Sequence, residues 1–259
     1  MSTGAPEDIN RRVTTRRGDA SLRRSVTLFR VFLREQDDPD MFYGVLAADS
    51  VAQVQQWCDL DGARVVDVGG GPGYFADAFR RAGASYAGLE PDAGEITATG
   101  TSGLNLVRGS GMALPLADGC VDLAYSSNVL EHVPDPRAMA AEMVRVAAPG
   151  AHVVISWTPW LSPHGGHETG LWHYLGGRRA AERYARRHGR RPKNDFGRSL
   201  FACGVAPMVR WAREAERAGD VVVRAVLPRY HPWWARWVVD VPGLREVLSW
   251  NVMIVMERR

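Results

Sequence analysis

The stretch RVVDVGGGPGYF, residues 64–75, places one carboxylate and a set of glycines at the end of a short apolar run. Gly69, Gly70, Gly71 and Gly73 can adopt backbone angles that are closed to other residues, so the chain can press close against a ligand here. A helix predicted to follow the turn points its first N–H groups at that ligand, which favours an anionic group. The turn is therefore a candidate binding site.

Two ligands suit such a turn, the pyrophosphate of a dinucleotide and the methionyl end of S-adenosylmethionine (SAM). Gly71, Gly73 and Ala76 satisfy G-x-G-x-x-A, which is a weak dinucleotide signature. Asp67 extends the pattern to D-x-G-x-G-x-G, and its carboxylate can face the ammonium group of SAM, whereas it would repel a pyrophosphate. The residues favour SAM; a tight turn that binds no ligand is the alternative.

A second carboxylate, Glu90, ends the apolar run YAGLE and is followed by Pro91. A carboxylate at the tip of the second strand can accept hydrogen bonds from both hydroxyls of a ribose. NAD enzymes use the same arrangement, so Glu90 does not discriminate between the two ligands, and a solvated charge at a strand end is the alternative.

The stretch RGSGMALPLADGCVDLAYSSNVLEHVPDP, residues 108–136, resembles the class I SAM-dependent methyltransferases, in particular their small-molecule branch. Members typically read G-D-A-x-x-L-P-F, then F-D-x-V, then L-E-H-V. The positions that match are Gly109, Leu114, Pro115, Asp122, Leu130, Glu131, His132 and Val133. With the glycine turn and Glu90, the resemblance covers about residues 50–157. It implies an enzyme that uses SAM as methyl donor and releases S-adenosylhomocysteine.

The resemblance also implies a role for each matching position. The methionyl end of SAM would be held by Asp67, Gly69, Gly70, Gly71 and Gly73, and the ribose by Glu90 and the adjoining Pro91. The turn of Ser110, Gly111 and Met112 would border adenine, and the floor beside the sulfonium would be lined by Ser126, Ser127 and Asn128. Ser110 departs from the family, which has an aspartate there. The usual carboxylate contact to the adenine amino group is therefore lost, or replaced by a hydroxyl or backbone acceptor.

Candidate catalytic groups lie in SWTPWLSPHGGHETGLWHYLGG, residues 156–177. A hydroxyl acceptor needs a base as it attacks, and histidine suits this near neutral pH. The candidates are His164, His167, Glu168 and His173; His167 is the predicted base, with Glu168 orienting it. A structural loop with surface histidines is the alternative. A helical zinc site at residues 164–168 is opposed by the two glycines inside it.

Glu131 and His132 directly follow the fourth predicted strand. In some relatives this histidine and an acidic pair help to hold a divalent metal, but Asn128 stands where the first carboxylate is wanted. We therefore predict no metal, and we expect Glu131 and His132 to hydrogen-bond loop backbone and shape the pocket.

Short apolar runs alternate with helical patterns along the chain. Strands are predicted at 64–68, 85–89, 105–108, 121–126, 151–157, 220–228 and 250–257, and helices at 21–34, 41–57, 73–82, 135–147, 177–188 and 205–218. This alternation predicts an α/β fold, a Rossmann-like seven-stranded and mostly parallel sheet with helices on both faces. The resemblance implies that the final strand is antiparallel. We expect a disordered lead-in at 1–20 and one domain at 21–259, with an inserted cap segment at about 158–200.

Two further features bear on partners. A basic stretch runs from Arg178 to Lys193, and it is either a solvated helix face or an attraction for an acidic substrate or anionic lipid. Trp233, Trp234 and Trp237 lie close together and either pack under the cap or contact a membrane. The two features allow peripheral membrane contact and a lipid-linked or phosphorylated glycan as acceptor.

Composition narrows the classes of function. The chain has 259 residues, 46% of them apolar, and a net charge of +3, which is too small to indicate nucleic-acid binding. No apolar run reaches the length of a membrane span, the three cysteines lack metal-ligand spacing, and no secretory signal is present, so a cytoplasmic setting is predicted. We predict methyl transfer to a small molecule, with oxygen ahead of nitrogen. The rivals are an NAD-dependent oxidoreductase and a non-catalytic SAM-binding protein; the oligomeric state is not indicated.

Overall fold

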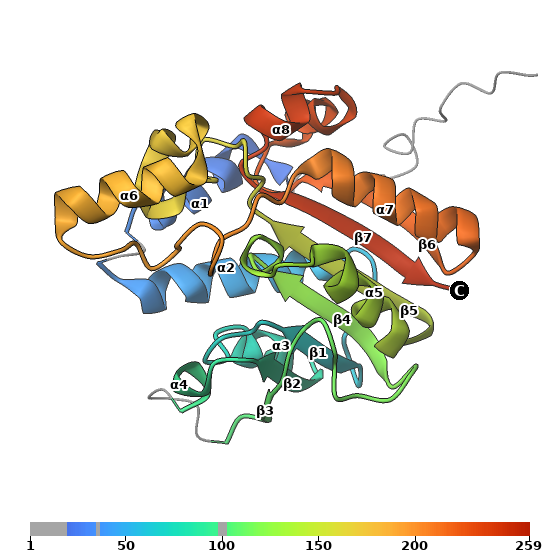
Figure 1. Ribbon diagram of the computed structural model, residues 1–259. Helices are drawn as coiled ribbons and strands as arrows, with labels where there is room; N and C mark the ends of the chain where they lie inside the picture. Colours follow the sequence, from blue (N-terminus) through green and yellow to red (C-terminus); the bar gives the residue numbers. More distant parts are fainter. Residues whose placement is uncertain (1–19, 35–36, 98–102) are drawn as a thin grey trace, which may run out of the picture.

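The computed structural model describes residues 20–34, 37–97 and 103–259 (Figure 1). A single sheet has the strand order β3-β2-β1-β4-β5-β7-β6, in which β7 alone is antiparallel to its neighbours. The strands are β1 (Arg64–Val68), β2 (Ser85–Glu90), β3 (Leu106–Arg108), β4 (Val121–Ser127), β5 (Ala147–Trp157), β6 (Val221–Pro228) and β7 (Val252–Arg258). The predicted Rossmann-like sheet and its antiparallel final strand are confirmed. The strand order reverses between β1 and β4, where such sheets bind ligands at the carboxyl ends of their strands.

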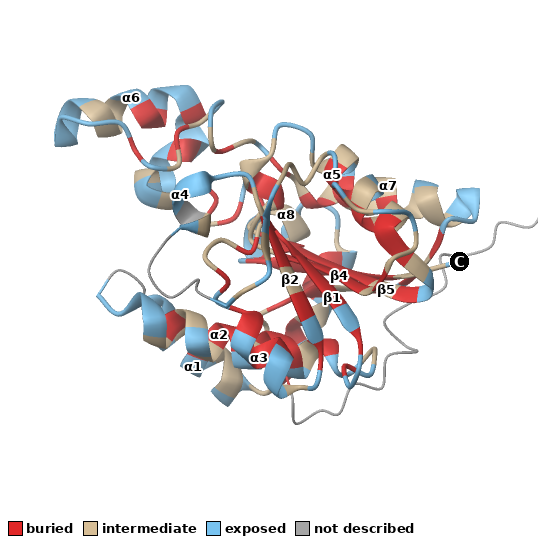
Figure 2. Cartoon of the chain, turned by 90° about the horizontal axis from the view of Figure 1, so that it is seen from below, coloured by how far each residue is buried: buried red, intermediate tan, exposed pale blue. Residues whose placement is uncertain are grey.

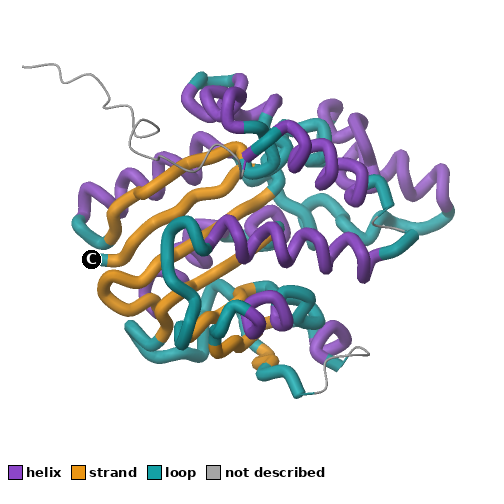
Figure 3. Tube along the Cα trace, turned by 180° about the vertical axis from the view of Figure 1, so that it is seen from behind, coloured by secondary structure: helices purple, strands orange, loops and turns teal. Residues whose placement is uncertain are grey.

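Helices cover both faces of the sheet (Figure 3). One face packs against α2 (Pro39–Val54) and α3 (Ala76–Arg81), and the other against α5 (Pro136–Val146) and α7 (Val205–Ala218). The remaining elements are α1 (Leu22–Phe32), α4 (Ala93–Ile96), η3 (Leu130–His132), η4 (His167–Leu175), α6 (Gly177–His188), η5 (Trp233–Asp240) and α8 (Leu244–Leu248).

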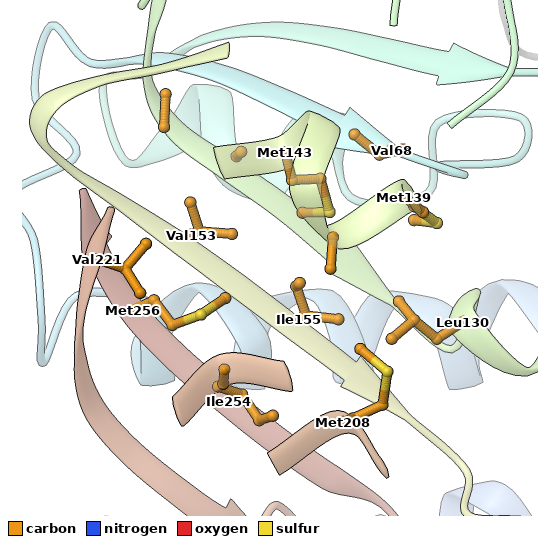
Figure 4. Close-up of a cluster of buried hydrophobic side chains, with 14 of the residues drawn as sticks. Val68, Leu130, Met139, Met143, Val153, Ile155, Met208, Val221, Ile254 and Met256 are labelled. Carbon is orange, nitrogen blue, oxygen red and sulfur yellow. The ribbon is translucent and has the colours of Figure 1, made fainter. Parts of the chain in front are cut away.

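The core beside α5 fixes the strand ends that carry the candidate site (Figure 4). Met139 and Met143 of α5 are fully buried against Val68, the last residue of β1, and Leu130, which follows β4. Burying such a side chain contributes about 1.5–3 kcal/mol. The ends of β1 and β4 are therefore held in one position relative to α5.

Several boundaries depart from prediction. Helix α3 begins at Ala76, not at 73, because Gly73 has φ +87°, outside the helical region. Helix α2 begins at Pro39, because the carboxylate of Asp38 caps it by accepting from the N–H of Met41 at 3.1 Å. The elements η5 and α8 lie between β6 and β7, where the sequence predicted none.

Residues 158–200, the predicted cap segment, leave the sheet at the carboxyl end of β5 and contain η4 and α6 (Figure 2). At the C-terminal end of this segment, the N–H of Phe201 donates a hydrogen bond to the carbonyl oxygen of Glu131 at 2.7 Å, which attaches the segment to η3 after β4. Its role as a cap stays a prediction, and the predicted lead-in lies outside the described residues except for Ala20. Within the described ranges, no helix combines the length and apolar character needed to cross a membrane.

Candidate active site

The glycine turn after β1 has the backbone that the sequence predicted. Gly69, Gly71 and Gly73 have φ values of +79°, +54° and +87°, a region that side chains disfavour. A Cβ atom on Gly69 would lie 2.5 Å from Val129, whereas one on Gly71 would meet nothing within 4 Å. The turn is therefore packed tightly on one side and open at Gly71, which suits a ligand that approaches the backbone.

Glu90 joins the tips of β1 and β2. Its carboxylate accepts from the N–H of Gly71 and from the N–H of Asp92, both at 3.1 Å. The neighbouring Pro91 is exposed, and its carbonyl oxygen accepts from Arg108. The carboxylate thus lies beside the open part of the glycine turn, at the end of the second strand.

Asp67 does not lie where the sequence analysis put it. The side chain is 1% exposed, accepts from the hydroxyl of Tyr86 at 2.8 Å and lies beneath Gly70. Burial raises the pKa of Asp67 to about 7, the hydrogen bond from Tyr86 opposes the rise, and the charge of Glu90 adds to it. Side chains alternate along a strand, so Asp67 shares the face of Val65, which α2 and α3 cover. It supports the turn from below and does not face the open side.

Ser126 and Ser127 end β4 and Asn128 follows it; these are the residues predicted to line the floor beside the sulfonium. Ser126 is fully buried and its hydroxyl donates to the carbonyl oxygen of Val68 at 2.8 Å, so it ties β4 to β1 and does not line the floor as predicted. Ser127 and Asn128 are half-buried. Asn128 has φ +58°, and its side-chain oxygen accepts from Asn251 at 2.6 Å. A non-glycine residue with this backbone is strained by about 1–3 kcal/mol, and such strain concentrates at functional sites.

The turn after β3, residues 110–112, lies beside the end of β1. The hydroxyl of Ser110 accepts from the N–H of Met112 at 3.2 Å, which stabilises the turn itself. A Cβ atom on Gly111 would lie 3.0 Å from Val68, so the turn packs against the end of β1. The predicted adenine-bordering residues are thus next to the glycine turn, with the Ser110 hydroxyl already engaged within its own turn.

Arg229, which sequence reasoning missed, is buried under the floor with 3% of its surface exposed. Its guanidinium has five N–H groups, and five neutral acceptors surround it at 2.5–3.2 Å: Gln53, Ser127, Ser156, Ser50 and Tyr125. These acceptors come from α2, β4 and β5. The one sequence signal was an arginine directly after a mostly apolar strand. Arg229 holds the floor residue Ser127 in place.

Glu131, His132 and His167 come together beside this floor, and one ligand atom from each lies within 4.8 Å of the others. Nδ1 of His132 is 2.7 Å from the carbonyl oxygen of Ser199. A carbonyl only accepts, so Nδ1 carries the proton and Nε2 carries the lone pair. His132 thus binds cap backbone, as the sequence analysis expected.

Two buried atoms of this cluster, Oε2 of Glu131 and Nε2 of His167, lack a hydrogen-bond partner within the described part of the chain. Burial, together with the neighbouring rings of His132, His164 and His173, lowers the pKa of His167 to about 3. Burial also raises the pKa of Glu131. The cluster therefore holds a neutral imidazole and a carboxyl group with unused hydrogen-bonding capacity.

Of the four predicted catalytic residues, His167 joins the cluster and the others lie elsewhere. Glu168 is exposed and accepts from the amide of Asn194 at 3.1 Å, so the carboxyl group beside His167 is that of Glu131 and not the predicted one. His173 is buried against the ring of Trp160, with its Nδ1 2.7 Å from the carbonyl oxygen of Gly170. The ring of His164 packs edge-on against Phe32. Neighbours in sequence were a poor guide to neighbours in space here.

Comparison with known proteins agrees with this fold. Residues 66–155 match the model of a family described as a methyltransferase domain. A protein of Mycolicibacterium gilvum is 53% identical over 249 residues, which span 92% of this chain and 96% of the relative. A protein of Mycobacterium marinum is 51% identical over 93% of this chain and 96% of its own length. Both are described as uncharacterized methyltransferases. The chain belongs to this methyltransferase family.

The fold has a solved counterpart in a SAM-dependent methyltransferase of Mesorhizobium loti. The TM-score is 0.55 at 21% identity, over 82% of this chain and 98% of that one. This likeness shows the fold, and the family match together with the relatives confirms the identification as a class I SAM-dependent methyltransferase. The NAD-dependent oxidoreductase is set aside as an alternative.

Proposed function

We propose that this methyltransferase transfers the methyl group of SAM to a hydroxyl group of a small molecule bound between the floor and the cap segment. The observation that carries the proposal is the cluster of Glu131, His132 and His167. It combines a buried imidazole nitrogen that has no partner in the described residues with a carboxyl group, directly after the strand that ends in Ser127. An amine or carboxylate acceptor would need no such base.

The residues around the turn fit the donor. Gly69, Gly71 and Gly73 would take its methionyl end, and Glu90 would accept from its ribose hydroxyls. The open space at Gly71 and the position of Glu90 beside it support this assignment. Asp67, Pro91 and Ser126 would act through the backbone they support. The turn of Ser110, Gly111 and Met112 would border the adenine.

When bound, SAM supplies a methyl group that its positive sulfur activates. The protein must then align the acceptor and exclude water, which the floor and the cap segment would do. We propose that Nε2 of His167 takes the proton of the acceptor hydroxyl as the hydroxyl oxygen bonds to the methyl carbon, while the bond from that carbon to sulfur would break and S-adenosylhomocysteine would leave. The low pKa keeps the ring neutral, so its lone pair is available at pH 7. Burial also makes the imidazolium costly, and the carboxyl group of Glu131 would offset that cost.

The test compares His167→Ala with His188→Ala, a histidine at the end of α6 that stacks on Tyr184. Transfer of radiolabelled methyl groups from SAM to small-molecule and lipid extracts would be measured beside calorimetric SAM affinity. We expect turnover to fall about 10²–10⁴-fold in His167→Ala with SAM affinity unchanged, and His188→Ala to behave as wild type. Equal turnover in His167→Ala would show that His167 is not the base, and labelled methylamines or methyl esters in place of methyl ethers would exclude a hydroxyl acceptor.

A further inference from the structure

Helix α1 turns an apolar stripe toward solvent. The sequence places apolar side chains at 22, 26, 29 and 33, a spacing that normally buries one helix face in the core. In the structure Leu22, Val26 and Leu33 are exposed, Leu33 by 63%, and the buried residue is Leu28 on another face. The helix is held in this orientation by Arg24, which pairs with Asp49 of α2 at 2.6 Å.

Two more elements expose large apolar side chains. Trp234 and Trp237 of η5 are 56% and 52% exposed, with Trp233 beside them. On α8, which packs against η5, the exposed residues are Leu244, Val247 and Leu248. The apolar surface is defined here as the exposed side chains Leu22, Val26, Leu33, Trp233, Trp234, Trp237, Leu244, Val247, Leu248 and Trp250.

These elements form one surface. The ring of Trp250, just after α8, lies 5.1 Å from Phe29 of α1 and 5.5 Å from His164 of the cap segment. On η5, burial lowers the pKa of Arg236, and the like charge of the nearby Arg24 of α1 lowers it further. Helices α1 and α8 lie next to each other in the upper half of Figure 1. Exposed apolar patches of this kind mark interaction sites.

The surface borders the candidate active site. Strand β6 runs parallel to β5, because both are antiparallel to β7, so its carboxyl end lies at the ligand-binding edge. Element η5 begins four positions after Arg229, which follows β6 and holds Ser127. Helix α8 leads to Asn251, which donates to Asn128. The apolar surface is therefore connected to the floor residues Ser127 and Asn128 through Arg229 before η5 and Asn251 after α8.

Positive charge accompanies the surface on the same edge. Helix α6 of the cap segment carries five arginines and a single acidic residue, Glu182. Among the described residues, the arginines of α6 have no carboxylate within 4.0 Å: Arg178, Arg179, Arg183, Arg186 and Arg187. The guanidinium of Arg183 lies 3.7 Å over the ring of Trp172, which is itself exposed. Tryptophan and arginine together are typical of a protein surface at a membrane interface.

We propose that the apolar surface docks on an anionic lipid bilayer, with the arginines of α6 against the headgroups. Each such arginine near an anionic surface contributes about 1 kcal/mol, and the tryptophans and leucines add burial at the headgroup boundary. A second copy of the chain fits less well, because a two-fold contact would bring the same basic helices toward each other. Docking would also present the active site to the bilayer. A lipid or lipid-linked acceptor follows from this only if the proposed function holds.

The test is flotation of the full chain, without SAM or acceptor, with two kinds of vesicles. One kind is phosphatidylcholine alone, and the other contains about one third phosphatidylglycerol. We expect binding to the anionic vesicles to be at least about tenfold stronger, and to fall at least about tenfold in W233A/W234A/W237A and in R179Q/R183Q/R186Q. The control is Val107→Ala, an exposed apolar residue on the edge strand β3, which should bind as wild type.

Circular dichroism and thermal unfolding check that the variants fold. If the triple tryptophan variant does not fold, quenching of tryptophan fluorescence by brominated lipid tests docking of the wild-type chain directly. Equal binding to both vesicles, or no quenching, would overturn the proposal. So would a dimer in solution that the triple tryptophan variant dissociates, because the surface would then be an interface between copies. None of these readouts needs turnover, so a failed docking test leaves the proposed methyl transfer standing.

Discussion

The hydroxyl of Tyr86 lies 2.8 Å from the carboxylate of Asp67, and both side chains are buried beneath the glycine turn. The sequence pattern predicts that the Asp67 carboxylate contacts a ligand, but in the structure it lies under the glycine turn and supports the backbone there. Its pKa is raised by burial to about 7, although Tyr86 stabilises the charged form. The stability of the fold is therefore linked to the protonation of one buried group.

The raised pKa of Asp67 predicts a pH dependence of stability. Between about pH 4 and pH 7 the folded protein holds this proton while the unfolded chain has lost it. The free energy of unfolding should therefore fall as pH rises through this window, by on the order of a few kcal/mol. Asp67→Asn keeps the shape but does not titrate, so it should lack this loss. Urea unfolding of both proteins across the window measures the difference; parallel curves would contradict the assignment.

The packing of Gly69 predicts that Gly69→Ala loses SAM binding. The added Cβ would lie 2.5 Å from Val129 and would occupy a backbone angle that alanine disfavours. We expect the affinity to fall at least about tenfold. Gly62→Ala is the matched control, since Gly62 has φ +71° with nothing within 4 Å and lies in the turn before β1. It should lose about 1–2 kcal/mol of stability and keep its SAM affinity in calorimetry.

The buried guanidinium of Arg229 predicts a large loss of stability in Arg229→Met. The substitution removes the N–H groups that donate to Ser127, Ser156 and Tyr125. Each buried polar group that is left without a partner costs about 1–3 kcal/mol. Arg224→Met is the control, because its exposed pair with Glu257 should contribute no more than about 1 kcal/mol. Chemical unfolding compares the two variants. Similar losses would mean that the network under the floor contributes little.

The bond from His132 to the cap segment predicts different behaviour of two amide variants. Asn can replace Nδ1–H as donor to the carbonyl oxygen of Ser199, whereas Gln places its amide near the position of Nε2. We expect His132→Asn to keep the melting temperature and His132→Gln to lower it by several degrees, about 1 kcal/mol. The opposite order would show that Nε2, not Nδ1, makes the contact that stabilises this segment.

Metal removal tests whether the cluster of Glu131, His132 and His167 transfers a proton or binds a metal. Two imidazoles and a carboxylate can also hold zinc, whereas a base at His167 needs no metal. We expect dialysis against EDTA to leave methyl transfer unchanged, and calorimetry with Zn²⁺ to show no site that Glu131→Gln abolishes. Activity that is lost with EDTA and restored by Zn²⁺ would reassign these three residues from proton transfer to metal binding.

The sequence by itself determined the sheet, its order of elements and the class of enzyme. Apolar runs and helical periodicity are local properties, and so is the backbone freedom of Gly69, Gly71 and Gly73. Each could be found from neighbouring residues alone, and together with the motif around Glu131 they led to the methyltransferase family.

Which side chains meet was decided by the tertiary structure. Strand alternation buries Asp67 and Ser126, and the fold brings His167 to Glu131 across 36 positions instead of to the adjacent Glu168. The five acceptors around Arg229 come from three separate elements, α2, β4 and β5, so no local pattern could show them. Nor could periodicity show that the apolar stripe of α1 faces outward, because a pattern gives the face of a helix but not what lies against it.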